Sequence, residues 1–308
     1  MKIYENIIDL IGSTPLIRLP KIEKKLNLYG RIIVKQEGKN PMGSAKDRVA
    51  LSIIEGLEKS GKIKVGDTII EPTSGNTGIA IAAVAAIKGY KAIIVMPNTM
   101  SKERISLIKA YGAEVILTDG AGGMKASIEK AEEIQKSIEG SVIASQFTNP
   151  DNPLAHYNST APEILRDTDG DVDYIVCTIG TGGTISGIGK FFKEKKSDIK
   201  IIGVEPSASP LLTKGYASPH KIQGIGANFI PETLDRGVID EIITVSDEDA
   251  YEGVRILART EGILAGISSG AALKAGIEIA SRKESEGKNI VILLPDSLDK
   301  YLSEGIFD

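Results

Sequence analysis

Six short apolar runs, separated by longer helical patterns, limit the possible folds of this chain more than any other feature. The runs are rich in β-branched residues and bounded by turn residues, as is typical of buried strands. They are residues 68–70, 92–96, 114–117, 174–177, 201–204 and 290–294. Amphipathic stretches lie between them, most clearly at residues 102–111 and 127–139. This alternation predicts an α/β fold with parallel sheets and helices on both faces.

The length and charge of the chain narrow the possible partners. Its 308 residues suffice for one large domain or two closely joined ones. The net charge of −4 argues against nucleic acid or an anionic membrane as a partner, because neither would attract this chain. No stretch approaches 18 uninterrupted apolar residues, so no membrane span is expected.

The sequence has one cysteine and two histidines, which restricts its redox and metal chemistry. Cys177 lies in an apolar run, where a small buried hydrophobe is favoured over a nucleophile. One cysteine excludes an internal disulfide and fits a reducing compartment, so we expect a cytoplasmic protein. The first 15 residues lack the pattern of a secretory signal. No carboxylate cluster indicates a metal site.

Lys46 follows a glycine and a serine at an expected helix start. Ser44 is a good N-cap for a helix that places Lys46 in its first turn. Most lysines are solvated surface residues, but the positive end of a helix lowers the pKa of an ammonium there. An amine that works near neutrality needs a depression of roughly 3 pKa units, or about 4 kcal/mol. The helix dipole supplies at most about 2 kcal/mol, so desolvation or a Schiff base must supply the rest.

A glycine-rich loop, Gly180-Thr181-Gly182-Gly183-Thr184, follows one apolar run and opens an expected helix. Backbone N–H groups in such a turn converge on one point, and the helix dipole favours an anion there. The alternatives are a turn without a ligand and a dinucleotide site that uses Glu205. Ile185 occupies the third glycine position of the dinucleotide fingerprint, so a single phosphate suits the loop better.

Two further loops carry small polar groups. The segment Thr73-Ser74-Gly75-Asn76-Thr77-Gly78 offers hydroxyls, an amide and helix-start N–H groups that would hold a carboxylate, or it is only a capping loop. Ser268 or Ser269 opens another expected helix, and a hydroxyl there is either a cap or a neutral partner for a pyridine nitrogen. Together the amine, the two anion loops and the hydroxyl are the parts needed to hold pyridoxal phosphate and an amino acid.

The same segments resemble the cysteine synthase (O-acetylserine sulfhydrylase) family, fold-type II pyridoxal-phosphate enzymes of the β-replacement branch. The resemblance covers nearly the whole chain and rests on residues 11–16, 40–48, 71–78, 96–101, 180–184, 220–226 and 262–272. It implies two open, mostly parallel twisted sheets of the tryptophan-synthase-β type, with the active site between two domains. Residues 41–145 would form the smaller mobile domain. Residues 1–40 plus 146–308 would form the larger domain, which binds the cofactor phosphate.

The resemblance also implies roles for individual residues. Lys46 would carry pyridoxal 5'-phosphate as a Schiff base and, once freed, act as the base on the α-proton. Asn76 would bond the ring hydroxyl of the cofactor, and Ser268 would face its pyridine nitrogen. The phosphate would be held by Gly180, Thr181, Gly182, Gly183 and Thr184. The substrate carboxylate would be clamped by Thr73, Ser74, Thr77 and Gln146.

Three segments depart from the usual pattern of the family. Asn228 stands where a glycine is usual, on a loop that faces the substrate entrance. Its amide would bind a second substrate or orient a water, or it is a tolerated loop substitution. Residues 159–165 and 295–301 also differ, the latter lacking the common Gly-Glu-Arg before its tyrosine.

We therefore expect a homodimeric transferase that forms L-cysteine from O-acetyl-L-serine and sulfide through an aminoacrylate. The main alternative uses L-cysteine as donor, releases hydrogen sulfide and forms L-serine or L-lanthionine. A distant alternative is an NAD-binding oxidoreductase. A further partner that the resemblance allows is the C-terminal tail of serine acetyltransferase. The sequence has no additional haem or regulatory domain, which argues against a long cystathionine synthase form.

Overall fold

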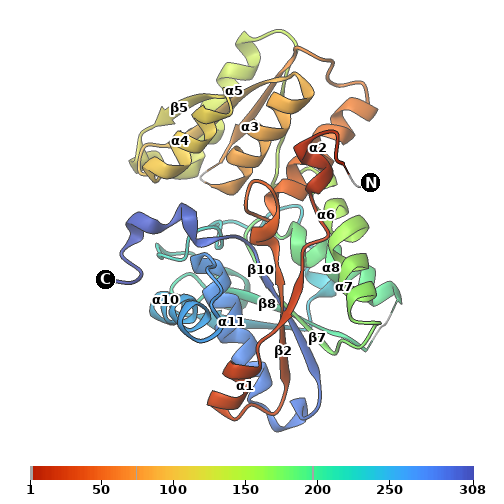
Figure 1. Ribbon diagram of the computed structural model, residues 1–308. Coiled ribbons are helices and arrows are strands. Elements are labelled where there is room, and N and C mark those ends of the chain that lie inside the picture. The colour runs from red at the N-terminus through yellow and green to blue at the C-terminus, as the bar shows by residue number, and fades with distance from the viewer. Residues whose placement is uncertain (1–2, 74, 196–197) are drawn as a thin grey trace. The chain divides into compact units, whose positions relative to one another are not determined.

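The structure, a computed structural model, describes residues 3–73, 75–195 and 198–308. It divides into two compact units, one formed by Met1–Ile11 with Asn40–Asn152 and the other by Gly12–Lys39 with Pro153–Asp308. The chain therefore enters the second unit, leaves it at Lys39 and returns at Pro153. Each unit contains its own sheet, and Figure 1 shows the helices that surround each of them.

The first unit is built on a four-stranded parallel sheet in the order β5-β4-β3-β6. Its strands are β3 (Thr68–Pro72), β4 (Lys91–Pro97), β5 (Glu114–Thr118) and β6 (Ser141–Ile143). Its helices are α2 (Lys46–Lys59), α3 (Asn76–Lys88), α4 (Lys102–Ala110) and α5 (Gly123–Ser137). A short helix α6 (Asp151–Ala155) runs across the boundary between the units. Ile70 and Val95 pack against Ala131 and Ile134 of α5, which gives this sheet one apolar face.

The second unit contains a six-stranded sheet in the order β1-β2-β10-β7-β8-β9. Its strands are β1 (Leu16–Arg18), β2 (Arg31–Gln36), β7 (Tyr174–Thr178), β8 (Lys200–Pro206), β9 (Glu241–Val245) and β10 (Asn289–Leu294). All its pairs are parallel except β1 with β2. Its helices are α1 (Pro20–Leu26), α7 (Ala161–Asp167), α8 (Gly183–Lys195), α9 (Leu211–Lys214), α10 (Asp247–Ile256) and α11 (Ile267–Ala280).

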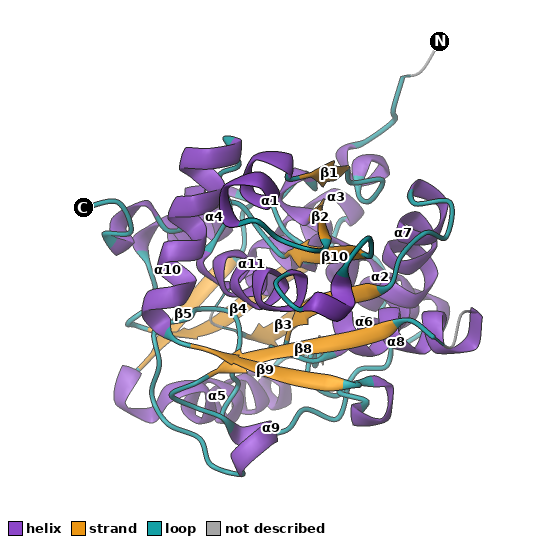
Figure 2. Cartoon of the chain, turned by 90° about the horizontal axis from the view of Figure 1, so that it is seen from below, coloured by secondary structure: helices purple, strands orange, loops and turns teal. Residues whose placement is uncertain are grey.

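Strand β10 shows why both faces of this sheet are covered. Ile290, Ile292 and Leu294 point into the core cluster that includes α11 and α10. Val291 and Leu293 point into a second cluster, with Ile188 and Phe192 of α8. Successive side chains of a strand face opposite sides, so a continuous apolar run requires helices on both. Figure 2 shows α11 beside β10, with α8 near β8.

The predicted fold class is confirmed, and all six predicted strands are present within the β3, β4, β5, β7, β8 and β10 spans. The two amphipathic stretches correspond to α4 and α5. The structure corrects two helix starts. Helix α2 begins at Lys46 with Ala45, not Ser44, as the preceding cap residue. Helix α11 begins at Ile267 after Gly266, one residue before Ser268.

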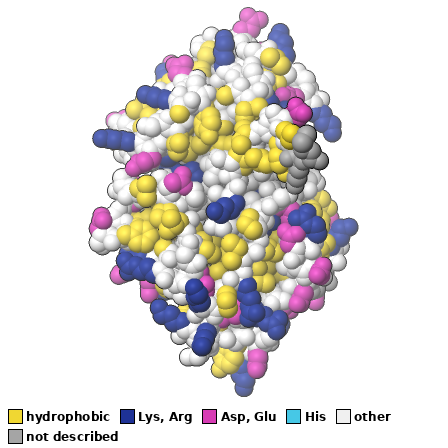
Figure 3. Space-filling view, in the orientation of Figure 1, with side chains coloured by type: hydrophobic (Ala, Val, Ile, Leu, Met, Phe, Trp, Pro, Cys, Tyr) yellow, Lys and Arg dark blue, Asp and Glu magenta, His cyan; other side chains and the backbone are white. Residues whose placement is uncertain are grey.

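No helix within the described part of the chain combines the length and apolar character needed to cross a membrane. On the face shown in Figure 3, lysine and arginine side chains are interspersed with aspartate and glutamate.

Helices α10 and α11 approach each other through facing glycines, and this contact provides a test of the packing. A Cβ on Gly253 would overlap the carbonyl oxygen of Gly270. We expect Gly253→Ala to lower the free energy of unfolding by roughly 1–3 kcal/mol, because neither backbone can yield without shifting its helix. Urea denaturation measures the change. The matched control, Glu248→Ala on the exposed first turn of α10, should stay within about 0.5 kcal/mol; equal losses would contradict the tight crossing.

Candidate active site

Lys46 is the first residue of α2, a helix of 14 residues, and it is partly buried. The hydroxyl of Ser44 accepts a hydrogen bond from Lys46 N at 3.2 Å, so Ser44 still supports this turn. The position agrees with the sequence prediction of a lysine in the first helical turn. A cation there lies at the positive end of the helix dipole, which disfavours its charged form.

The carboxylate of Asp47 organises the turn before Lys46, a role that the sequence analysis missed. Asp47 is fully buried, and it accepts from Met42 N at 2.6 Å and from the Ser44 hydroxyl at 3.3 Å. An acidic residue at the start of a helix is also favoured by the helix dipole. The signal in the sequence was an aspartate directly after the candidate lysine. That segment was interpreted only for its helix N-cap, Ser44.

The candidate carboxylate loop lies between β3 and α3 of the same unit. The Thr73 hydroxyl accepts from Gly75 N at 3.2 Å, and α3 begins at Asn76. The Thr77 hydroxyl donates to Gln146 Oε1 at 2.6 Å, although the two residues are 69 positions apart. Both side chains are almost fully buried. Besides Gln146, four candidates of this unit stand at or beside helix starts: Lys46, Thr73, Asn76 and Thr77. Ser74 lies outside the described residues.

Glu71 was not singled out from the sequence, yet it lies beneath this loop. It is 1% exposed at the end of β3 and accepts from Ser145 N at 2.9 Å. Burial raises the pKa of Glu71 to about 8. Nearby N–H groups of Gln146 and Ser145 act in the opposite direction but do not cancel this increase. The available signal was a carboxylate that directly continues an apolar strand run, where an acidic residue needs a specific partner.

The glycine-rich loop in the second unit has the geometry of an anion cradle. Gly182 has φ +80°, and a Cβ there would lie 2.6 Å from Leu234 Cβ. A Cβ on Gly180 would overlap the carbonyl oxygen of Gly224. Helix α8 begins at Gly183, whose N–H contacts the Thr181 hydroxyl at 3.4 Å. Close packing thus excludes a side chain at both Gly180 and Gly182, so a ligand would meet backbone there, as phosphate binding requires.

The other side of this loop is anchored through hydrogen bonds. The Thr233 hydroxyl donates to Thr181 O at 2.6 Å. The Thr184 hydroxyl lies 3.1 Å from His156 Nε2, and Nδ1 of that ring lies 2.9 Å from Thr160 Oγ1. His156 is fully buried and was not considered from the sequence. The hydroxyl of Thr184 therefore takes part in a structural network as well as bordering the loop.

Ser268 lies in the first turn of α11 and is 3% exposed. Within the described part of the chain its hydroxyl has no hydrogen-bond partner. A Cβ on Gly224 would come within 4.0 Å of Ser268 Oγ, and the same glycine adjoins Gly180. Gly224 thus links the phosphate loop to the serine inside one unit. A buried hydroxyl with free bonding capacity, next to a backbone anion cradle, fits a phosphorylated pyridine.

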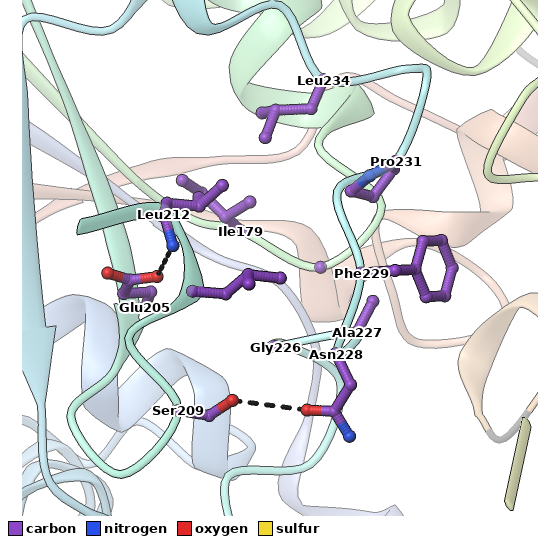
Figure 4. Close-up of a pocket in the computed structure, with 12 residues that line it drawn as sticks. Ile179, Glu205, Ser209, Leu212, Gly226, Ala227, Asn228, Phe229, Pro231 and Leu234 are labelled. Atoms are coloured by element: carbon purple, nitrogen blue, oxygen red, sulfur yellow. Dashed lines mark hydrogen bonds between the residues drawn. The ribbon is translucent and has the colours of Figure 1, made fainter. Parts of the chain in front are cut away.

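Asn228 lines a small pocket in the second unit, shown in Figure 4. Its φ is +63°, a conformation that glycine and asparagine tolerate. Its Oδ1 accepts from the Ser209 hydroxyl at 3.3 Å, so the amide nitrogen points away from Ser209 (Figure 4). The side chain is therefore oriented as a hydrogen-bond donor.

Glu205 and Cys177, which were considered above for a dinucleotide site and as a nucleophile, have structural roles instead. The Glu205 carboxylate accepts from Leu212 N at 2.9 Å (Figure 4). It also accepts from Thr213 N at 3.1 Å and from Thr213 Oγ1 at 2.5 Å, which leaves little capacity for a ribose. Burial raises the pKa of the Cys177 thiol to about 12, so this cysteine is a core residue rather than a nucleophile.

The chain also matches a family of known proteins over nearly its whole length. A family model described as pyridoxal-phosphate dependent enzyme matches residues 7–296. The chain belongs to this family. It therefore depends on pyridoxal phosphate, whose phosphate and ring suit the cradle and the hydroxyl described above.

Individual relatives narrow the comparison. A cysteine synthase of Staphylococcus aureus is 48% identical over 309 residues, with 99% of this chain and 98% of the relative covered. The crystal structure of a cysteine synthase from Entamoeba histolytica matches with a TM-score of 0.96 and 46% identity, covering 99% of this chain and 91% of that chain. A hydrogen sulfide-producing enzyme from Fusobacterium nucleatum matches with a TM-score of 0.93 and 50% identity, covering 97% and 100%.

The cradle can be tested through cofactor retention. We expect Gly182→Ala to weaken pyridoxal phosphate binding at least tenfold, because the new methyl group would meet Leu234 and φ +80° disfavours alanine. Equilibrium dialysis with absorbance detection measures the affinity. Gly215→Ala, also at positive φ but with open space around it, is the matched control. Equal weakening in both variants would show that backbone strain alone, and not the cradle, is responsible.

The raised pKa of Glu71 predicts a pH-dependent stability. The folded state holds a proton that the unfolded state releases, so stability should fall as the pH rises from about 4.5 to about 8 and then level off. Each unit of elevation corresponds to about 1.4 kcal/mol. Urea denaturation of the apoprotein at pH 6 and pH 9 measures this. Glu71→Gln should flatten the slope; a variant with the wild-type slope would show that Glu71 is ionised throughout.

Proposed function

We propose that this enzyme forms L-cysteine from O-acetyl-L-serine and sulfide by replacing the substituent on the β-carbon. The observation that carries the proposal is the whole-length similarity to cysteine synthases, at 48% and 46% identity. The loops described above support it, because they offer groups for an α-amino acid as well as for the cofactor. When bound, pyridoxal phosphate supplies an electron sink for negative charge at the α-carbon.

The proposed roles follow from the chemistry of each side chain. Lys46 Nζ holds the cofactor, then takes the proton from the α-carbon and later returns it. Acetate leaves the β-carbon, and hydrosulfide adds to the same atom. The helix start at Lys46 lowers the cost of the neutral amine that accepts this proton.

Binding groups would orient the two ligands. Gly180 to Thr184 receive the phosphate, Asn76 bonds the ring hydroxyl, and Ser268 faces the pyridine nitrogen. Thr73, Ser74, Thr77 and Gln146 receive the substrate carboxylate. Ser268 is a neutral partner, which leaves the electron sink weaker than a carboxylate partner would and so favours early loss of the β-substituent. We further propose that residues 41–145 form the mobile part that closes over the amino acid, and that the site lies between the two domains.

A second candidate reaction uses L-cysteine as the donor. Two observations favour it: the 50% identity to a hydrogen sulfide-producing enzyme, and the oriented amide of Asn228. Hydrogen sulfide would leave the β-carbon, and water or a second cysteine would add, giving L-serine or L-lanthionine. Loss of acetate from O-acetyl-L-serine and loss of hydrogen sulfide from L-cysteine would use the same residues around the α-carbon, so Asn228 and its loop would decide between the reactions.

Assembly and location are also proposals. A homodimer is supported by the apolar side chains of Ile3, Tyr4, Ile7 and Leu10, which are exposed near the N-terminus. The C-terminal tail of serine acetyltransferase is a further possible ligand of the same site. A cytoplasmic location is supported by the single, buried cysteine. Sedimentation of the purified protein tests the dimer, and a tail peptide titrated against the holoenzyme tests the docking.

The amine is tested first. We expect wild-type protein to bind pyridoxal phosphate with a visible absorption band, and Lys46→Ala to lose both the band and at least 10³-fold of the turnover, because base and anchor are removed together. Absorbance and product analysis provide the two measurements. Lys39→Ala is the control and should retain both. A colourless wild-type protein would overturn the assignment of Lys46.

The leaving group is tested by comparing two assays. The holoenzyme should turn over O-acetyl-L-serine plus sulfide at least tenfold faster than L-cysteine alone, with the products identified by mass spectrometry. Faster release of sulfide from L-cysteine would establish the second reaction instead. Asn228→Gly restores the residue usual in the family, and φ +63° accommodates it. If Asn228 serves the cysteine reaction, this variant should lose that activity and keep the other.

A further inference from the structure

Gly224 lies between two groups of the second unit that suit opposite ends of the cofactor. Its carbonyl oxygen is close to Gly180, since a Cβ on Gly180 would come 2.4 Å from that oxygen. On its other side, a Cβ on Gly224 would come 4.0 Å from Ser268 Oγ. Gly180 belongs to the phosphate loop, and Ser268 offers a hydroxyl to a pyridine nitrogen. A phosphorylated pyridine that spans the two would therefore lie alongside the Gly224 peptide.

Gly224 is the least restrained residue of a loop that is otherwise well anchored. Ile222 and Ile225 are buried in the core cluster that includes β10 and α11. Gly226 N donates to Ile179 O at 3.1 Å. Gly224 itself is exposed and has φ +91°, a conformation that only glycine adopts readily. Because glycine has the greatest backbone freedom of any residue, a fixed position for this peptide needs a restraint close by.

The side chain of the preceding residue supplies such a restraint. Gln223 is half-buried, and its Nε2 donates to Glu304 Oε1 at 2.8 Å, across 81 positions of the chain. A hydrogen bond to a carboxylate is stronger than one to a neutral acceptor. Since Gln223 directly precedes Gly224, this bond limits how far the Gly224 peptide can move.

Glu304 is held in place on both sides by the C-terminal segment. On one side its N–H donates to Tyr301 O at 3.0 Å, and the buried Tyr301 donates its hydroxyl to Asp296 Oδ2. On the other side the buried Ile306 accepts at its carbonyl oxygen from Arg255 Nη1 at 3.0 Å. The carboxylate that receives the Gln223 amide therefore belongs to a fixed part of the unit.

We propose that Glu304 is a positioning residue for the cofactor, acting through Gln223 on the Gly224 peptide. The same segment also supports the opposite group, because Asp296 O accepts from Gly266 N at 3.2 Å, directly before α11 and its candidate serine. The C-terminal segment thus supports both groups beside which the pyridine ring would lie. This inference concerns the cofactor alone and goes beyond the proposed reaction, whose amino acids do not enter it.

The test compares two ligands of the full-length chain after its cofactor has been removed. Pyridoxine 5'-phosphate has the ring and the phosphate but no aldehyde, so its binding requires no bond to Lys46. Inorganic phosphate needs only the cradle. We expect Glu304→Ala to weaken pyridoxine 5'-phosphate binding about fivefold and phosphate binding less than about twofold, because a hydrogen bond that restrains the peptide beside the ring is lost. Isothermal titration calorimetry measures both dissociation constants.

An exchange of donor and acceptor tests the bond itself. Glu304→Gln keeps an oxygen that accepts from Gln223, so it should bind pyridoxine 5'-phosphate within about twofold of wild type. Gln223→Glu places two carboxylates against each other and should weaken this binding about fivefold or more. Glu304→Gln added to Gln223→Glu supplies a donor for the new carboxylate, so the double variant should return to within about twofold of wild type.

A matched control and a spectroscopic measurement complete the experiment. Glu252 is a carboxylate of the same unit that accepts from Lys274 Nζ at 2.6 Å, and Glu252→Ala should leave both dissociation constants unchanged. In the holoenzyme, Glu304→Ala should reduce the visible circular dichroism of the bound cofactor, which reports how asymmetrically its surroundings hold the ring. Glu304→Gln and Glu252→Ala should retain the wild-type signal.

Three outcomes would overturn the proposal. Equal weakening of both ligands by Glu304→Ala would show that the whole cradle is loosened. Wild-type binding of pyridoxine 5'-phosphate by Glu304→Ala would show that the bond does not act on the ring. A double variant that binds as weakly as Gln223→Glu would show that the two side chains do not act as a pair. No amino acid or sulfide is present, so failure of the proposed reaction is read separately, from the product assays.

Discussion

The positive ends of helix dipoles, where backbone N–H groups point out of the helix, are the constraint on which the candidate site depends. Helices α2 and α3 begin at Lys46 and Asn76, and α8 and α11 begin at Gly183 and Ile267. Helices α3, α8 and α11 each follow a loop. The backbone N–H groups of their first turns therefore point toward that loop, because no earlier helical turn offers them carbonyl groups. The positive end of a helix dipole has opposite effects on anions and on cations. It attracts the phosphate expected at Gly183 and disfavours the ammonium form of Lys46.

The periodicity of the sequence was sufficient for the parts of the fold that are buried on both faces. Strands such as β10 are continuous apolar runs because helices cover both sides, and that pattern is local. Strand β2 escaped notice because Lys35, near its end, is a charged residue. Its ammonium is buried against the Glu163 carboxylate at 2.7 Å, a partner 128 residues away. Strands β1 and β6 have three residues each, too few to show a period. Pairing across such distances is a tertiary effect that no short window contains.

The site shows the same division between local and distant information. Glycine-rich turns and helix-start polar residues are local signals, and they led directly to residues 73–77, 180–184 and 268. The groups behind them were not visible in this way. Asp47, Glu71 and His156 are buried side chains whose meaning lies in their partners, and each partner belongs to another turn or element. A buried acid or histidine in a sequence resembles an exposed one until its surroundings are known.

Asn228 illustrates how a chain can change one group without rebuilding its loop. A position with φ +63° strongly limits the replacements for glycine, and asparagine is among the few that fit at low cost. The substitution therefore adds an amide while leaving the backbone conformation in place. Ser209 then takes the oxygen of that amide and leaves its nitrogen directed elsewhere. A change in the groups that leave and attack the β-carbon could thus arise here without disturbing the residues expected to hold the cofactor.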